Sequence, residues 1–250
     1  MADLILQIKY GGLGDHLFYS HIPRIAKESG TYERVMLSTK SEFRHPDYRT
    51  LVWETNPYFD GFVDADGLYP EFAEVGNDEN LLDRIMLDLG LDDGQRWHDP
   101  EIYYTPKAVP QLTDRNIYDP NYVSYVGNIH SYDLSRYVRK NKVKIDYKMR
   151  QRNIAIDIPV NQELDTPTLE DFCDLILSCN RFYCLSSGAA TLAAALKKPA
   201  TVFFGAGQKP MFHHSKLHSY VLIEVSTVTS IRQRVSSWVN SCKIRFWEQS

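Results

Sequence analysis

The sequence contains no apolar run of the ~20 residues that a membrane-spanning helix needs. Basic residues are not in excess, since 28 Lys and Arg stand against 32 Asp and Glu and the pI is near 6.1. This balance argues against a nucleic-acid binder, which needs clustered cations. The four cysteines form no CxxC pair, and His213 and His214 are adjacent rather than at ligand spacing, so we expect no metal site. The opening residues, MADLILQIKYG, do not resemble a signal peptide, which predicts a cytoplasmic protein.

What the sequence does have is an alternation of apolar strands and amphipathic helices, which predicts an α/β protein with parallel sheets. The expected strands are 4–10, 34–38, 61–66, 122–127, 153–158, 181–187, 200–205 and 220–225. The expected helices are 15–29 with a kink at Pro23, a short one at 47–54, then 77–90, 168–179, 188–198 and 231–242. Asn77 or Asp78 is the expected N-cap and Gly90 the expected C-cap of the third helix, and Thr168 with Asp171 forms a capping-box pattern.

Residues 92–116 are rich in Pro, Gly and Asp and have little periodicity, so we interpret them as a linker. Two domains are therefore predicted, residues 1–108 and 109–250, each Rossmann-like and facing the other across a cleft. A ligand is expected in that cleft, at the carboxyl ends of the strands. The basic stretch 135–152 fits a solvated surface better than a site that attracts an anionic ligand or membrane surface.

A glycine-rich turn, GGLGD at residues 11–15, lies between the first strand and the first helix. Such turns usually receive phosphate on backbone N–H groups, yet this one carries the carboxylate of Asp15. The structural alternative is that Asp15 caps the helix. A dinucleotide-dependent oxidoreductase is a weaker alternative, because Leu17 stands where the Gly-rich fingerprint needs a small residue.

A second candidate site is SSGAATLAAALKK, where Ser186, Ser187 and Gly188 begin an alanine-rich helix after an apolar strand. The first turn of such a helix binds anions, so a diphosphate could lie there, whereas the alternative is that the serines only cap the helix. Gly205, Gly207 and Lys209 follow the next strand at the same sheet edge and are expected to help. Elsewhere, Asp64-Ala65-Asp66 resembles the metal-binding DxD motif of GT-A glycosyltransferases, a pattern too short to be specific.

Four segments resemble, in the same order, the ADP-heptose:lipopolysaccharide heptosyltransferase family: GLGDHLFYSHIPRIAK, NPYFDGFVDAD, DPEIYYTP and TLEDFCDLILSCNRFYCLSSGAATLAAALKKPATVFFG. The resemblance covers most of the chain. It implies a GT-B fold and an inverting, metal-independent glycosyltransferase that needs no cofactor and uses a nucleotide-diphosphate sugar as its substrate. The implied acceptor is a saccharide or glycolipid of a cell-surface glycan at the cytoplasmic face, with peripheral rather than transmembrane attachment and no nucleic-acid partner.

The resemblance also implies roles for residues. Asp15 matches the family's proposed general base, Gly12 and Gly14 would shape its loop, and His16 and His21 would contact the acceptor, although packing roles are commoner for histidines. The family's donor-side pattern falls on residues 186–191, but Ser186 stands where the family has Asp and Thr191 where it has His. The expected donor-binding residues are Ser186, Ser187, Gly188, Thr191, Gly205, Gly207 and Lys209. These departures leave open a catalytically silent module that only binds a nucleotide sugar.

Overall fold

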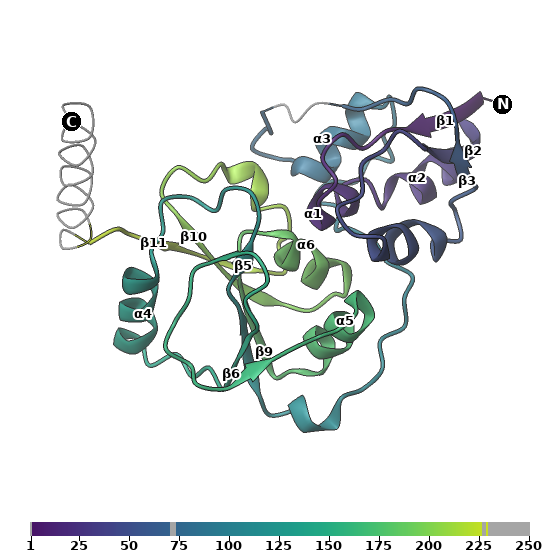
Figure 1. Ribbon diagram of the computed structural model, residues 1–250. Helices are drawn as coiled ribbons and strands as arrows, with labels where there is room; N and C mark the ends of the chain where they lie inside the picture. The colour runs from purple at the N-terminus through teal and green to yellow at the C-terminus, as the bar shows by residue number, and fades with distance from the viewer. Residues whose placement is uncertain (1, 71–73, 227–228, 230–250) are drawn as a thin grey trace, which may run out of the picture.

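The computed structural model describes residues 2–70, 74–226 and 229 (Figure 1). Its first half contains a parallel three-stranded sheet in the order β1-β2-β3. The elements are β1 (Ala2–Leu6), α1 (Leu13–Leu17), α2 (Ile22–Glu28), β2 (Tyr32–Ser38), a π-helical turn (Arg49–Glu54), β3 (Gly61–Val63) and α3 (Leu81–Asp88). The single helix expected at 15–29 is therefore two helices. Pro23 lies in the first turn of α2, where its missing N–H has no helical partner to lose.

The second half contains a parallel six-stranded sheet in the order β11-β10-β9-β4-β6-β8. Its strands are β4 (Asn116–Asp119), β6 (Tyr147–Met149), β8 (Glu163–Leu164), β9 (Arg181–Leu185), β10 (Ala200–Gly205) and β11 (Ser219–Ile223). The strand expected at 122–127 was misplaced. Every residue of β4 is buried, whereas Val123 and Tyr125 are exposed. There, β5 (Asn121–Tyr122) and β7 (Ile154–Ala155) pair as a separate antiparallel ribbon.

Within the part of the chain that the structure describes, three helices cover the six-stranded sheet. Helix α4 (Ser131–Lys140) lies on one face, and α5 (Leu169–Ser178) and α6 (Gly188–Ala195) lie on the other (Figure 1). The expected Thr168–Asp171 capping box is present at α5, with both reciprocal hydrogen bonds formed. Helix α3 is capped by Asn80 rather than by Asn77 or Asp78, and Gly90 follows it with a φ of +73°. The helix expected at 231–242 lies outside the described residues.

One apolar core continues from the first sheet to the α5–α6 face of the second. The two halves meet where α1 faces α6, and the space is tight at Gly188, whereas an added Cβ on Gly14 would make an ordinary contact. A Cβ atom on Gly188 would lie 3.1 Å from the backbone nitrogen of Gly14, and a Cβ on Gly14 would lie 3.5 Å from the Cα of Gly188. Residues 92–109 of the expected linker contain no helix or strand. The domain boundary at residue 108 stays a prediction.

Candidate functional site

A cavity of about 260 Å³ opens between the two halves, beside the α1–α6 contact. It lies at the carboxyl ends of β4, β6, β8 and β9, the expected edge for a ligand of a parallel sheet. Both segments singled out from the sequence line it. The first half contributes Gly12, Leu13, Gly14, Asp15, Phe18, Arg44 and Tyr48, and α6 with its preceding loop contributes residues 186–191. The acid and the helix N-terminus therefore share one space.

The wall from the first half is built around Asp15. Gly12 is the N-cap of α1, and its N–H donates to Asp15 Oδ2 at 3.0 Å. Asp15 is therefore the third residue of the helix rather than its N-cap, but its carboxylate still caps the helix start by accepting the N–H of the N-cap residue. A Cβ on Gly12 would lie 2.8 Å from Asp15 Oδ2, so only glycine leaves this carboxylate in place.

Burial raises the pKa of Asp15 to about 6, and the Gly12 N–H and the Arg44 guanidinium offset part of that rise. An acid with a pKa close to neutrality can both exist as the carboxylate and accept a proton from a substrate hydroxyl. Arg44 is exposed, lines the cavity and makes no hydrogen bond or ion pair with another described residue through its guanidinium. A cation is thus available beside the acid.

The wall from the second half ends in the first turn of α6. Ser187 is the N-cap residue, but its hydroxyl makes no cap hydrogen bond and is buried without a partner among the described residues. Ser186 Oγ accepts from Gln208 Nε2 at 3.4 Å. The interpretation of the two serines as helix caps is therefore not supported. The hydroxyl of Ser187, the N–H groups of the first turn and the buried Thr191 are placed for an anion in the cavity.

The residues expected after β10 have a different position. Gly205, Gly207 and Lys209 do not line the cavity, whereas Gln208 does. Gly205 allows a close backbone approach, because a Cβ there would lie 2.3 Å from the carbonyl carbon of Asn128. Gly207 has a φ of +87° and leaves room for Tyr125, which lines the cavity.

The two histidines expected at the acceptor are fully buried and do not line the cavity. His16 Nδ1 accepts from Trp53 Nε1 at 3.0 Å, its Nε2 donates to the Glu42 carbonyl at 2.9 Å, and burial lowers its pKa to about 4. His21 stacks on His98 with 5.5 Å between ring centroids. Both histidines have packing contacts.

Several cavity residues were not predicted from the sequence. At the end of β6, Arg150 and Arg152 line the cavity and both pair with Asp165, at 3.3 and 2.5 Å. They lie at the end of the basic stretch 135–152, for which the sequence favours a solvated surface. Asp119, at the end of β4, is a second buried carboxylate, and burial raises its pKa to about 6. The sequence signal for Asp119 is an acid at the end of a strand, but the sequence predicts that strand at 122–127 instead of 116–119.

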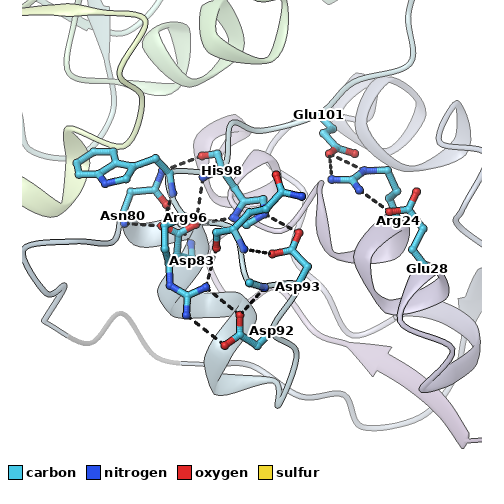
Figure 2. A network of polar contacts seen from close by, with 12 residues as sticks. Arg24, Glu28, Asn80, Asp83, Asp92, Asp93, Arg96, His98 and Glu101 are labelled. Atoms are coloured by element: carbon cyan, nitrogen blue, oxygen red, sulfur yellow. Dashed lines mark hydrogen bonds and ion pairs between the residues drawn. The ribbon is translucent and has the colours of Figure 1, made fainter.

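A separate polar network fixes the segment that joins the halves (Figure 2). We call it the Asp83 network; it consists of Arg24, Glu28, Asn80, Asp83, Asp92, Asp93, Arg96, His98 and Glu101. Asp83 accepts from the backbone N–H groups of Asn80, Trp97 and His98 and from His98 Nδ1 at 2.5 Å. Asn80 Nδ2 donates to the carbonyls of His98 and His214, which links α3 to a cavity residue of the second half.

His98 lies between two carboxylates, with Nδ1 toward Asp83 and Nε2 toward Asp93 at 3.0 Å. These partners raise the pKa of His98. The next residue, Asp99, holds the other half: Ser215 Oγ donates to it at 2.7 Å and Lys197 Nζ at 3.2 Å. Two neighbouring residues thus attach the joining segment to both halves.

The DxD-like pattern does not contribute to the cavity. Asp66 pairs with Lys40 at 2.7 Å, and neither it nor Asp64 lines the cavity. Within residues 2–70, 74–226 and 229, no group of three or more His, Cys, Asp or Glu side chains could hold a metal ion. No helix among these residues is both long and apolar enough to cross a bilayer.

No protein-family model matches the sequence, and no curated protein is significantly similar to it. Several solved structures are similar to it in fold. A glycosyl transferase family 9 protein from Veillonella parvula aligns with a TM-score of 0.58 and 9% identity over 94% of this chain and 89% of that one. The overall arrangement is the one predicted. The chain has a GT-B-like fold.

Two further structures have the same similarity in fold. ADP-heptose LPS heptosyltransferase II of E. coli has a TM-score of 0.58 and 11% identity, over 88% of this chain and 90% of that one. The iron-containing dodecameric glycosyltransferase TibC of enterotoxigenic E. coli has a TM-score of 0.58 and 14% identity over 87% of this chain, and the match spans 61% of TibC. Identities this low show a shared fold alone.

Proposed function

We propose that this protein is an inverting, metal-independent glycosyltransferase that moves a sugar from a nucleotide-diphosphate donor to a saccharide of a cell-surface glycan. One observation carries the proposal: the half-buried carboxylate of Asp15 and the N-terminus of α6 line the same cavity from opposite halves. The GT-B-like fold supports the same assignment, since the solved structures that share it are glycosyltransferases.

In the proposed reaction, Asp15 removes the proton from the acceptor hydroxyl. The freed oxygen bonds to the anomeric carbon while the bond from that carbon to the diphosphate breaks, and its electron pair leaves with the nucleotide. Ser186, Ser187, Gly188 and Thr191 would hold the diphosphate against the first turn of α6. Attack from the face opposite the leaving group inverts the anomeric configuration.

The pKa of Asp15 suits this role. A base must be deprotonated at the working pH and still have a useful affinity for the proton, and a pKa of about 6 meets both conditions. Arg44 beside Asp15 would orient the acceptor or stabilise the charge that develops during transfer. Arg150 and Arg152 add positive charge on the donor side.

The first test is thermal-shift screening against ADP-, GDP-, UDP- and CDP-sugars, because a ligand that binds only the folded state raises the melting temperature. We expect one nucleotide class to stabilise the protein and to support transfer to a saccharide acceptor with inversion, read from the anomeric signals in NMR. Transfer should persist in chelator. No stabilisation by any of these donors would contradict the proposal.

A second test separates the enzyme from a silent binding module, which the departures at Ser186 and Thr191 leave possible. Asp15→Asn should abolish turnover while nucleotide-sugar affinity is retained, whereas Asp64→Asn, outside the cavity, should leave both unchanged. A wild-type protein that binds the donor and transfers nothing to any saccharide tested would favour the silent module.

A further inference from the structure

The second buried carboxylate of the cavity, Asp119, belongs to a strand end that the proposed function does not use. Asp119 is 5% exposed and lines the cavity at the end of β4, a central strand of the six-stranded sheet. Its partner in the neighbouring strand β9 is Cys184, two residues before Ser186. The carboxylate therefore lies close to the donor-side loop.

Only one of the two oxygens of Asp119 has a structural task. Oδ1 accepts from the backbone N–H of Asn121 at 3.1 Å and from Asn121 Nδ2 at 2.7 Å, which fixes the turn into β5. Oδ2 makes no hydrogen bond or ion pair with any other described residue. Asp119 lines the cavity, so a ligand bound there could donate a hydrogen bond to this oxygen.

The charges around Asp119 indicate which ligand group would supply the donor. The N-terminus of α6 favours phosphates in the same cavity, and Arg150 and Arg152 together carry one positive charge more than Asp165, with which both pair, neutralises. The hydrogen-bond donors of a ligand that carries phosphates and sugars are chiefly its sugar hydroxyls. A carboxylate oxygen accepts such hydrogen bonds strongly.

We propose that Asp119 is a specificity-determining residue that accepts hydrogen bonds from sugar hydroxyls of the bound nucleotide sugar, through the oxygen that Asn121 leaves free. The proposal rests on the proposed function. It gives the donor side of the cavity a carboxylate from β4, whereas position 186 in the adjoining loop is a serine. The hydroxyls belong either to the nucleotide's ribose or to the transferred sugar, and both present the same chemistry.

The test uses Asp119→Asn, which retains a carbonyl oxygen for Asn121 and replaces the free acceptor by an N–H donor. Asp133→Asn is the matched control. Asp133 is 4% exposed, its Oδ1 accepts from Ser226 N at 3.1 Å, its Oδ2 has no partner among the described residues, and it does not line the cavity. Calorimetry would compare the tightest-binding sugar nucleotide of the ADP, GDP, UDP and CDP series with the matching nucleoside diphosphate.

We expect Asp119→Asn to weaken the sugar nucleotide about 10- to 100-fold and Asp133→Asn to change it by less than about twofold. An equal loss for the nucleoside diphosphate assigns the contact to the ribose, and a loss confined to the sugar nucleotide assigns it to the transferred sugar. Unchanged affinity of a folded Asp119→Asn protein for both ligands would overturn the inference and leave the proposed function standing. A wild-type protein that binds none of these ligands would remove the proposed function itself.

Discussion

The cavity and the Asp83 network both contain carboxylates shielded from water, yet the pKa of these acids is shifted in opposite directions in the two regions. In the network, Asp83 and Asp93 accept hydrogen bonds from backbone N–H groups and from His98, and these donors lower the pKa of both acids (Figure 2). In the cavity, Asp15 accepts one hydrogen bond and Asp119 two, none of them from a histidine, and burial raises the pKa of both to about 6.

This difference in hydrogen bonding distinguishes acids that stabilise the fold from acids that are available to a ligand. A buried acid surrounded by donors is stable as a carboxylate and contributes to the fold, as Asp83 does when it holds residues 97 and 98 to α3. A buried acid with a free oxygen lowers stability at neutral pH, and where the acid lines a cavity, as Asp15 and Asp119 do, a ligand can complete the hydrogen bonding. The free hydroxyl of Ser187 fits the same rule, because it too lines the cavity.

The largest effect should come from removing the cavity acid. We expect Asp15→Ala to lower kcat by about 10²- to 10⁴-fold, the usual contribution of a positioned general base. The wild-type kcat/KM should rise with pH through about 6 and then level off, as Asp15 loses its proton. Steady-state kinetics across pH 5–9 would check both statements. Retention of most activity in the variant would remove Asp15 from the mechanism.

The next largest effect should come from the network and should appear in stability rather than in turnover. Asp83→Ala leaves three backbone N–H groups and the imidazole of His98 without their acceptor, which should cost about 2–4 kcal/mol of unfolding free energy. Urea unfolding measures this. The folded variant should bind the sugar nucleotide with unchanged affinity, and a selective loss of affinity without loss of stability would contradict the comparison.

The sequence predicts some elements of this fold correctly and misses others, for physical reasons. Helices α3 and α5 were predicted because their apolar spacing repeats over several turns, and the cap was predicted correctly for α5 but not for α3. The strands β6 and β8 were missed because three and two residues carry no readable period. The placement of β4 failed for a related reason, since its short buried run merges with the polar segment around it.

Within the site, local chemistry was readable and distant partners were not. Asp15 and the start of α6 each follow an apolar strand directly, so their positions at the sheet edge could be derived from order alone. The burial of His16 depends on Trp53, which lies 37 residues away and donates to its ring. Arg44 and Arg152 reach the cavity only through the way the two halves pack.

A smaller effect on the free energy of unfolding is expected from replacing one acid in each region by asparagine. Its dependence on pH should have opposite signs in the cavity and in the network. The pKa of Asp15 is higher in the folded than in the unfolded state, where it is near 3.8, so wild-type stability falls as pH rises from about 4 through 6. Asp15→Asn does not titrate and should be more stable than wild type by about 1–3 kcal/mol at pH 8, with no gain at pH 4. Thermal unfolding at both pH values would show it.

Asp83→Asn should instead lower stability at neutral pH. The pKa of Asp83 is lowered in the folded state, so its contribution is present above pH 4 and is lost as pH falls further. The pKa of His98 is raised, so the contribution of its charge is complete below pH 6.5 and declines as pH rises through its folded pKa. The network should therefore stabilise the fold most between these limits, and a gain in stability from Asp83→Asn at pH 6 would sink this account.

The smallest effect should come from the exposed edge of the network. Arg96 pairs with Asp92 at 2.8 Å, but water surrounds this pair and screens it, and holding two long side chains together costs entropy. We expect Arg96→Ala to leave the melting temperature and the sugar-nucleotide affinity unchanged within error. Because Arg96 and Asp83 belong to the same network, the contrast between their variants tests whether shielding, rather than charge pairing itself, gives the network its strength. A loss from Arg96→Ala as large as that from Asp83→Ala would show that the outer ion pair holds the segment.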